Sequence, residues 1–530
     1  MPNNFNLACA IHRHALATPE ATAVVCQGRS LSYSELAEQA ARLASCLRQS
    51  PDWPRQNGRI PRVGLLASRG VDACVALIGA SWSGATYVPI SMKQPEERIL
   101  GLFEQCELSA IVTDDQGAKL LNERLLAACP PLVIHTGQTR LETQANVNFS
   151  LKLLELSDLP PVRPEEPARL EATDTAYIIF TSGTTGVPKG VMISAGCARN
   201  YTTMIAEHLG LRADDRALET CELSFDFSVH NMFSTWQAGA ALHILPATTV
   251  MNAVKFARNS GLTVWNSVPS LASMLRHVKA LAPDSLASLR VTVFGGEQLP
   301  ANTVTAWQSA APNSRIFNLY GPTEATVFCT GHAVEEQLQL TPGRDVISIG
   351  TALPGNEAMI VDENDQPVTD GTSGELLIGG CQLADGYLGA PDLTARRFPT
   401  LNGKRWYRTG DLALRNAGGD YYCLGRIDNQ VKVMGYRVEL EEIDAHLRTV
   451  SGADVVGSIA WPVTDGGARG IVSFVHAASI DSEQIIDTLK SRIPSYMVPS
   501  RVIALKEMPL SNNGKVNRHA LRQLLDEGVA

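Results

Sequence analysis

One stretch of the chain combines small, hydroxyl-bearing and cationic residues in a pattern suited to binding phosphate. Its glycines let backbone N–H groups turn toward an anion, its hydroxyls can donate to phosphate oxygens, and its lysine adds a positive charge. The spacing matches neither Gly-x-x-x-x-Gly-Lys-Ser/Thr nor Gly-x-Gly-x-x-Gly. A flexible surface loop is the alternative interpretation of this composition. The stretch reads Tyr177-Ile178-Ile179-Phe180-Thr181-Ser182-Gly183-Thr184-Thr185-Gly186-Val187-Pro188-Lys189-Gly190.

Three further stretches place a charged side chain next to a tight turn. Glu324 follows a Gly-Pro turn and is a hard oxygen ligand of the kind that Mg²⁺ prefers. Asp411 lies at the end of an expected strand and can accept hydrogen bonds from two neighbouring hydroxyls. Lys515 follows Asn-Gly, where a lysine is ordinarily solvated. For each, a solvated polar turn is the alternative. The stretches are 318–324 (Asn-Leu-Tyr-Gly-Pro-Thr-Glu), 407–412 (Tyr-Arg-Thr-Gly-Asp-Leu) and 512–518 (Asn-Asn-Gly-Lys-Val-Asn-Arg).

Together, these four stretches resemble the motifs of the adenylate-forming superfamily, which comprises acyl-CoA ligases, luciferases and peptide-synthetase adenylation domains. The matches extend over about residues 31–518, nearly the whole chain. Residues 264–269 and 317–320 are similar to free-standing ligases that load D-alanine or proline onto carrier proteins. One departure is Ser91, where the family usually has aspartate.

The resemblance implies the cofactors ATP and Mg²⁺ and assigns residues to them. Glu324 becomes the metal ligand, and Lys515 the catalytic lysine that bridges the substrate carboxylate and the α-phosphate. By the same resemblance, Asp428 corresponds to the hinge about which the C-terminal domain swings. Gly435 corresponds to the glycine of the loop used for thioester formation. The implied phosphate-binding residues are Thr181, Ser182, Gly183, Thr184, Thr185 and Lys189. The implied adenine- and ribose-binding residues are Gly295, Gly296, Glu297, Asn318, Tyr320, Gly321, Thr323, Asp411 and Arg426.

The nature of the substrate depends on Asp226, which lies between two phenylalanines. A buried carboxylate in such a setting needs a cation or hydrogen-bond donors, although it would also serve as a helix cap. Peptide-synthetase adenylation domains resemble this stretch and use the aspartate for the substrate's ammonium group. The pocket implied by the resemblance consists of Asp226, Phe227, His230, Asn266, Val293, Gly295, Leu319, Val327 and Phe328, with Lys515.

This pocket suits a small amino acid and looks most like threonine-selective patterns. Serine, alanine, glycine and proline stay open, since the D-alanine and proline ligases also resemble the chain. His230 and Asn266 offer polar contacts, and packed or water-bound side chains are the alternative for both. The expected reaction forms aminoacyl-AMP and pyrophosphate and then transfers the aminoacyl group to a carrier thiol. An acyl-CoA ligase of the same fold is the nearest rival, and a nucleotide-binding regulatory protein that has lost catalysis is another.

The alternation of strand-like and helix-like segments predicts an α/β fold. We expect a large N-terminal core over residues 1–427, made of two doubly wound βα subdomains and a small β-barrel lobe. We expect a mobile C-terminal α+β domain over residues 428–530 that carries Lys515. Strands are expected at 23–26, 63–66, 87–90, 110–113 and 132–134 in the first subdomain, and at 242–245, 262–265 and 291–294 in the second. A helix is expected at 71–82, and the stretch 32–35 (Ser-Tyr-Ser-Glu) has the spacing of a capping box at the start of another helix.

Composition narrows the class of protein further. The chain has 530 residues, 45% of them apolar, which is enough for several cores. The net charge of −9 argues against a nucleic-acid partner. Eleven cysteines without ligand spacing, and no apolar run of about 20 residues, point to a reduced cytoplasmic protein with no membrane partner. No carrier-domain motif follows Lys515, so a separate phosphopantetheinylated carrier protein is expected.

Overall fold

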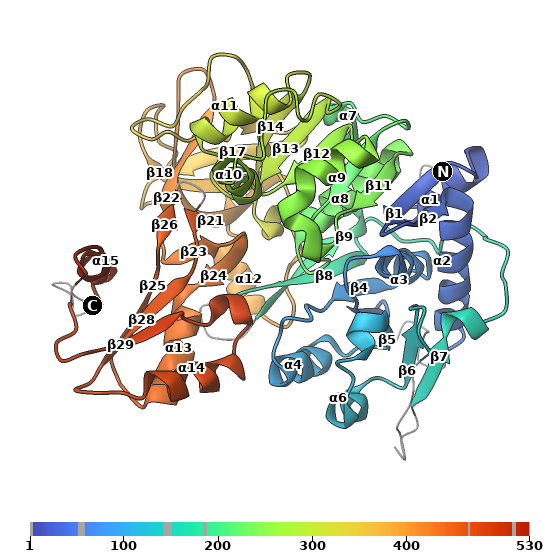
Figure 1. Cartoon of the computed structure of the whole chain (residues 1–530), viewed down its shortest axis with the longest axis horizontal. Coiled ribbons are helices and arrows are strands. Elements are labelled where there is room, and N and C mark those ends of the chain that lie inside the picture. The colour runs from blue at the N-terminus through green and yellow to red at the C-terminus, as the bar shows by residue number, and fades with distance from the viewer. Residues whose placement is uncertain are drawn as a thin grey trace.

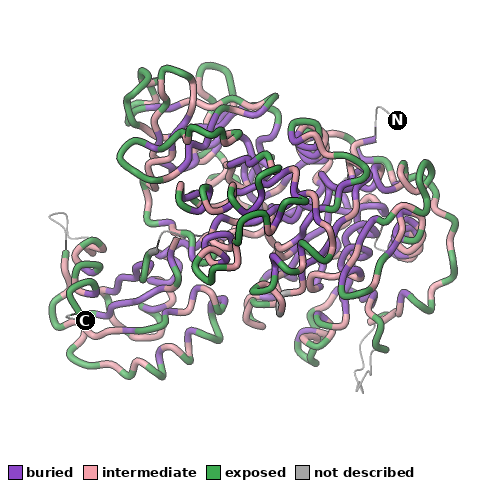
Figure 2. The backbone as a smooth tube through the Cα atoms, turned by 45° about the horizontal axis from the view of Figure 1, so that its top comes forward, coloured by how far each residue is buried: buried purple, intermediate pink, exposed green. Residues whose placement is uncertain are grey.

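A computed structural model places two large sheets side by side, with a small lobe and a separate C-terminal module beyond them (Figure 1). The structure describes residues 4–50, 53, 59–140, 151–183, 188–464, 467–510 and 516–528. The N-terminus and the C-terminus lie on opposite sides of the molecule. Buried backbone is concentrated inside the two sheets, and exposed backbone follows the outer loops (Figure 2).

The first sheet has eight strands and is parallel except at one edge. β8 and β9 are joined by the phosphate-binding stretch and pair antiparallel, with Thr181 opposite Lys189. The strands in spatial order are β19 (Gly386–Tyr387), β9 (Lys189–Ser194), β8 (Thr175–Thr181), β4 (Thr86–Pro89), β3 (Arg62–Leu66), β5 (Ala110–Thr113), β6 (Leu132–His135) and β7 (Lys152–Glu155).

The second sheet has nine strands, and its central strands are parallel. Its register sets Asn266 beside Val293 and Gly295 beside Leu319. The strands in spatial order are β16 (Thr351–Ala352), β15 (Thr330–Val334), β14 (Arg315–Tyr320), β13 (Val291–Gly295), β12 (Val264–Ser267), β10 (Arg216–Glu219), β11 (Ala241–Ile244), β1 (Thr22–Cys26) and β2 (Arg29–Ser32).

Helices form layers between and outside these sheets. The main core joins the facing sides of both sheets to α2, α3, α7 and α8, and α9, α10 and α11 cover the far side of the second sheet. α4 and α6 cover the far side of the first. The helices of the N-terminal part are α1 (Cys9–Ala17), α2 (Tyr33–Arg48), α3 (Val71–Trp82), α4 (Glu96–Cys106), α5 (Asp115–Ala118), α6 (Glu123–Ala128), α7 (Ala195–Leu209), α8 (Asp226–Ala238), α9 (Ala253–Ser260), α10 (Pro269–His277), α11 (Ala301–Ala310) and α12 (Pro391–Arg397), with 3₁₀ turns η1 (Leu156–Asp158), η2 (Ala247–Asn252) and η3 (Thr323–Ala325).

The small lobe is a five-stranded antiparallel sheet. It packs against the main core through residues such as Leu376 and Ile378, so it lies beside the second sheet and is not a separate body. Its strands are β17 (Asn356–Val361), β18 (Gly374–Gly380), β20 (Thr400–Leu401), β21 (Lys404–Arg415) and β22 (Tyr421–Arg426).

The C-terminal module has its own hydrophobic clusters around a three-stranded sheet. The chain leaves the small lobe after Arg426 and enters a new sheet at Gln430. The module's elements are β23 (Gln430–Val433), β24 (Tyr436–Glu439), α13 (Leu440–Ser451), β25 (Val456–Ala460), β26 (Val463–Thr464), β27 (Gly467–Ala468), β28 (Ile471–His476), α14 (Ser482–Lys490), η4 (Ser495–Met497), β29 (Arg501–Leu505) and α15 (Arg518–Asp526).

Many predicted elements are confirmed by the structure. The helix at Val71–Trp82 has the predicted bounds, and Ser32 and Glu35 form a complete capping box at the start of α2. The strand predicted at 262–265 begins two residues later, at Val264, because a left-handed Gly261 ends α9 and the chain first turns back. All 11 cysteines are free thiols.

One prediction about the sheets was wrong. The strand at 23–26 was expected in the first βα subdomain, but β1 pairs with β11 in the second sheet. β8, which carries the phosphate-binding stretch, pairs with β4 of the first sheet. Strand pairing over more than a hundred residues depends on packing between helices, which a local pattern does not encode. No helix within the described ranges is both long enough and apolar enough to cross a lipid bilayer.

Candidate functional site

The predicted nucleotide residues gather at the carboxyl ends of β13 and β14 and at the end of the small lobe nearest to them. Tyr320 donates its hydroxyl proton to Asp411, and Arg426 binds the other oxygen of Asp411 at 3.0 Å. The same arginine binds Asp428 at 2.6 Å. These side chains lie where parallel strands end, the usual ligand-binding edge of an α/β sheet. The predicted adenine and ribose residues are therefore neighbours in space.

Two glycines of this group are required by their surroundings. A Cβ on Gly295 would lie 2.4 Å from the ring of Phe328, and a Cβ on Gly321 would lie 2.2 Å from the carbonyl oxygen of Val327. Gly296 adopts φ +85°, and the space beside it is open except for Val268. Asn318 donates its amide to the carbonyl oxygen of Ser348 at 2.8 Å. That amide therefore supports the backbone of this edge.

The described part of the phosphate-binding stretch is in contact with the C-terminal module. Ser182 donates to the carbonyl oxygen of Arg437 at 2.9 Å, and the N–H of Gly183 donates to Glu442 at 3.1 Å. Lys189 lies 3.7 Å from Glu439. Burial lowers the pKa of Lys189, and the nearby Glu439 acts in the opposite direction. Thr184 and Thr185 lie outside the described residues.

Glu324, the predicted metal ligand, is a buried and ionised carboxylate. Its Oε1 accepts from the hydroxyl of Tyr387 at 2.8 Å, and its Oε2 pairs with Arg437 at 2.9 Å. Burial alone would raise its pKa, but Arg437 and Tyr387 outweigh it and hold the pKa at about 2. The residue fits a hard cation such as Mg²⁺. Because both oxygens are engaged, a metal ion would need Arg437 to release Oε2.

The loop between β23 and β24 reaches the adenine-side strip of the site. Lys432 binds the carbonyl oxygen of Gly296. Gly435 adopts φ +87°, and a Cβ there would lie 3.7 Å from Val268 and 3.8 Å from Glu297. Gly435 therefore lies beside Glu297, one of the predicted adenine residues. The hinge candidate Asp428 lies between the small lobe and this loop, and Lys515 lies outside the described residues.

The predicted substrate residues pack between the two large sheets, beside the nucleotide group. Asp226 and His230 are one turn apart on α8, so they share a face of the helix. Val293, Gly295 and Leu319 face this helix, whereas Phe294 between them faces α10 and α11. Successive side chains of a strand point to opposite faces of the sheet, so Val293 and Gly295 face the predicted substrate residues, and Phe294 packs against helices on the other face.

Asp226 is the first residue of α8, and Phe225 occupies the cap position. The alternative interpretation of Asp226 as a helix cap is thus wrong. Burial raises its pKa to about 6, and a hydrogen bond from Thr323 and the charge of Lys432 partly oppose this rise. No ion pair engages its carboxylate within the described ranges. It is ionised near pH 7 and is available to a cation.

The part of the site around His230 is aromatic and buried. The rings of Phe227, His230 and Phe328 pack edge to face, with centroids 5.1 to 5.6 Å apart. Val327, in a left-handed conformation with φ +70°, turns the chain so that Phe328 covers Gly295. His230 and Asn266 are 0% and 2% exposed. The structure brings all nine predicted pocket residues other than Lys515 together.

Several residues of this site were missed by the sequence reasoning. Arg437, Tyr387 and Glu442 contact Glu324 or the phosphate-binding stretch, and Tyr201 binds His230. Arg437 stands two residues after Gly435, so its position in the loop was a usable signal. Tyr201 lies in an ordinary amphipathic helix and carries no local signal at all.

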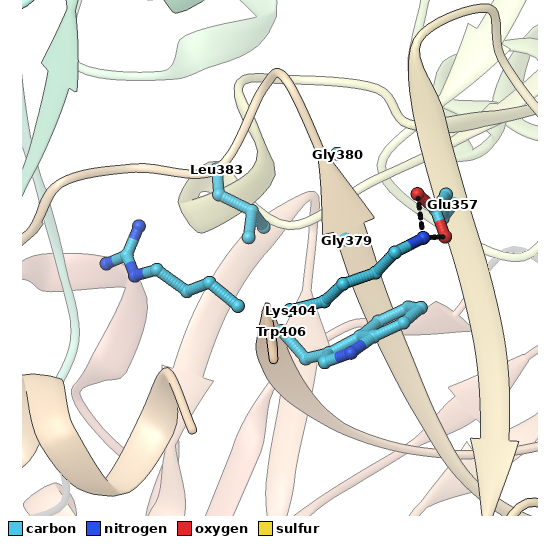
Figure 3. Close-up of a pocket in the computed structure, with 7 residues that line it drawn as sticks. Glu357, Gly379, Gly380, Leu383, Lys404 and Trp406 are labelled. Carbon is cyan, nitrogen blue, oxygen red and sulfur yellow. Dashed lines mark hydrogen bonds and ion pairs between the residues drawn. The ribbon is translucent and has the colours of Figure 1, made fainter. Parts of the chain in front are cut away.

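A hollow of about 350 Å³ on the small lobe lies away from this site. Lys404 crosses it to pair with Glu357 at 2.8 Å, and Trp406 lies beneath the lysine stem (Figure 3). Arg405 is committed to the carbonyl oxygens of Ala384 and Asp385. With its cations engaged, the hollow offers no unpaired group to a ligand among the residues that line it.

Comparison with protein families matches residues 11–388 to the family described as AMP-binding enzyme. Tyrocidine synthase 3 of Brevibacillus parabrevis is 32% identical over 98% of this chain and 8% of its own length. Surfactin synthase subunit 1 of Bacillus subtilis (strain 168) is 34% identical over 94% of the chain and 13% of its own length. The chain thus spans a small part of these relatives.

Solved structures give the same result for the fold. The Vibrio cholerae adenylation domain AlmE, in complex with glycyl-adenosine-5'-phosphate, superposes with a TM-score of 0.84 at 29% identity, covering 99% of this chain and 98% of that one. IdnL7 superposes with a TM-score of 0.72 at 28% identity, covering 99% and 100%. The predicted α/β architecture with its small lobe is confirmed by these likenesses.

Proposed function

Because this chain belongs to the family of AMP-binding enzymes, which form adenylates, we propose that it activates a small amino acid with ATP and then passes the aminoacyl group to a carrier protein. In the first step the substrate carboxylate attacks the α-phosphorus, and pyrophosphate leaves. In the second step the phosphopantetheine thiol of the carrier attacks the carbonyl carbon, and AMP leaves. The carrier is a separate protein in this proposal, and the cytoplasm is the expected compartment.

The observation that carries the proposal is the carboxylate of Asp226. It lies beside buried aromatic side chains and the predicted adenine residues, and no described cation pairs with it. A partly desolvated carboxylate is stabilised by a cation that binds there. The α-ammonium group of an amino acid supplies that charge, whereas a simple fatty or aryl acid does not. The position on α8 leaves the far end of the pocket for the side chain.

The nucleotide residues fit ATP. Asp411 can accept from the ribose hydroxyls once Tyr320 and Arg426 share their hydrogen bonds with the ligand. Gly295 and Gly296 have no side chain that would keep a base away from their backbone. Mg²⁺, when bound, would neutralise phosphate charge beside Glu324. Lys515 is proposed to stabilise the charge that develops on the α-phosphate, on the strength of its sequence match.

The position of the C-terminal module fits the second step of the reaction. Arg437 holds the carboxylate assigned to the metal, and Gly435 lies against Glu297 and Val268. A glycine at this point leaves room for a narrow pantetheine arm to pass. We propose that the module rotates about Asp428, so that Lys515 serves the first step and Gly435 the second.

Amino-acid-dependent exchange of pyrophosphate into ATP tests the first step. We expect exchange with a small amino acid and none with the matching carboxylic acid that lacks the amine, because Asp226 binds the ammonium group. A CoA-dependent assay with amine-free acids tests the acyl-CoA ligase rival. Strong thioester formation there, without amino-acid-dependent exchange, would show that the proposal is wrong.

A further inference from the structure

The imidazole of His230 forms one hydrogen bond of full geometry, at Nδ1. Its Nδ1 lies 2.6 Å from the hydroxyl of Tyr201, a buried residue of α7. The rings of Phe227 and Phe328 pack against the imidazole in T-shaped contacts. Burial lowers the pKa of His230 to about 3. The ring is therefore neutral near pH 7 and carries a single N–H.

The hydrogen bond to Tyr201 decides which nitrogen carries that proton. Tyr201 is 0% exposed, and His230 is the one acceptor that its hydroxyl meets within the described ranges. If Nδ1 donated instead, the hydroxyl proton of Tyr201 would be buried without an acceptor, which is costly. Tyr201 therefore donates to Nδ1, and the proton of the imidazole resides on Nε2.

Asn266 presents the complementary group from β12. Its Nδ2 points to the carbonyl oxygen of Leu218 at 3.5 Å, which leaves Oδ1 as the outward end of the amide. The Asn266 side chain lies close enough to the imidazole to act as a hydrogen-bond partner that raises the pKa of His230, so the amide oxygen lies on the imidazole side. Nε2 of His230 and Oδ1 of Asn266 nevertheless form no hydrogen bond of full geometry, with each other or with any other group in the described part of the chain.

We propose that Tyr201 is a positioning residue that holds His230 as an Nε2–H donor, so that His230 and Asn266 together read a hydroxyl group on the β-carbon of the substrate. The hydroxyl oxygen accepts from His230, and the hydroxyl proton is donated to Asn266. This rests on the proposed function and deepens it: the substrate class becomes a 2-amino-3-hydroxy acid, such as threonine or serine.

The spacing of these side chains agrees with this class. Asp226 and His230 are separated by one helical turn, about 6 Å along the axis, which a molecule with adjacent amine and hydroxyl groups can bridge. Phe328 covers Gly295 so closely that a Cβ would lie 2.4 Å from its ring. Larger side chains are thereby excluded, and Val293 and Leu319 offer apolar contact for a methyl group.

The first test compares substrates with and without the hydroxyl, using pyrophosphate exchange by the whole protein. L-Threonine is compared with L-2-aminobutyrate and L-valine, and L-serine with L-alanine; glycine, D-alanine and L-proline complete the series. We expect kcat/KM to favour a hydroxy acid over its deoxy counterpart by about 100-fold or more, because the analogue leaves two buried polar groups unpaired.

The second test removes the hydroxyl that sets the tautomer. In Tyr201→Phe the imidazole can also place its proton on Nδ1, so we expect the threonine to 2-aminobutyrate preference to fall by about 10-fold. The change is expected in KM for threonine, while kcat/KM for 2-aminobutyrate stays within about 3-fold. Tyr87→Phe is the matched control, since the hydroxyl of Tyr87 is buried with no hydrogen bond among the described residues.

Each result has a distinct meaning. If glycine, alanine or 2-aminobutyrate supports exchange as well as threonine and serine, amino acid activation stands and the hydroxyl-reading pair is wrong. If Tyr201→Phe lowers activity equally with threonine and 2-aminobutyrate, Tyr201 has only a structural role. If no amino acid supports exchange although ATP binds, the proposed function fails and this inference fails with it.

Discussion

On the proposed phosphate side of the site, charged groups from two parts of the chain meet: Glu324 pairs with Arg437, and Lys189 lies near Glu439. On the proposed amino acid side aromatic packing prevails, and the one histidine is neutral and hydrogen-bonded to the uncharged Tyr201. A carboxylate in an ion pair can exchange one cation for another, whereas close-packed side chains accommodate only a substrate whose shape fits between them. The first region is thus suited to two successive steps, and the second to a single fixed choice of substrate.

The largest effect is expected from a substitution of Lys515, which should slow adenylate formation but not transfer to the carrier. Lys515→Ala should slow pyrophosphate exchange by about 100- to 1,000-fold, because a charge that stabilises the transition state is lost. ATP binding, measured by calorimetry, should persist. Transfer from preformed aminoacyl-AMP to the carrier should also persist. Normal exchange by this variant would refute the role of Lys515.

Asp226→Asn tests the boundary between the two regions. We expect KM for the amino acid to rise by about 30-fold or more, since removing one member of a desolvated charge pair costs about 2 kcal/mol or more. KM for ATP should hardly change. An effect confined to ATP would mean that the carboxylate serves the nucleotide, and that the substrate need not carry an amine.

Arg437→Ala should act on the second step. Arg437 binds Glu324 at 2.9 Å and anchors the loop that contains Gly435. We expect carrier loading to fall by about 10-fold while exchange stays within about 3-fold, since the module no longer has its cation at the site. Equal loss in both assays would contradict the proposal that the present arrangement belongs to thioester formation.

The pH dependence of substrate binding should follow Asp226. Its pKa is raised to about 6, so the carboxylate binds ammonium fully above that pH and loses it by protonation below. KM for the amino acid should rise about tenfold for each pH unit below about 6. Asp226→Asn should abolish this slope. A slope that survives the substitution would have to come from another group.

The smallest effect is expected from a substitution in an exposed ion pair, and this variant serves as the control for Arg437→Ala. Arg415 pairs with Asp370 on the small lobe, with 45% and 39% of the two side chains exposed. Arg415→Ala should change the free energy of unfolding by less than about 0.5 kcal/mol and leave both steps unaltered. A loss of loading in this variant would show that the small lobe takes part in carrier docking.

The sequence by itself determined those features of the protein that depend only on residues close together in the chain. Hydrophobic periodicity placed α3, and the capping box placed the start of α2, because both depend on neighbours in the chain. The glycines beside Phe328 and Val327 and the carboxylates of Glu324 and Asp411 were recognisable from their motifs. That these residues lie together in space was predictable from the resemblance to a family, although not from their separation in the sequence.

Tertiary structure decided what depends on distant partners. In the folded chain β1 pairs with a strand of the second sheet, Arg437 forms an ion pair with Glu324, and Tyr201 is hydrogen-bonded to His230. No local pattern encodes these contacts, since they join segments from 29 to more than 200 residues apart. The tautomer of His230 follows from one such contact, because a buried hydroxyl must find an acceptor and only the folded chain supplies it.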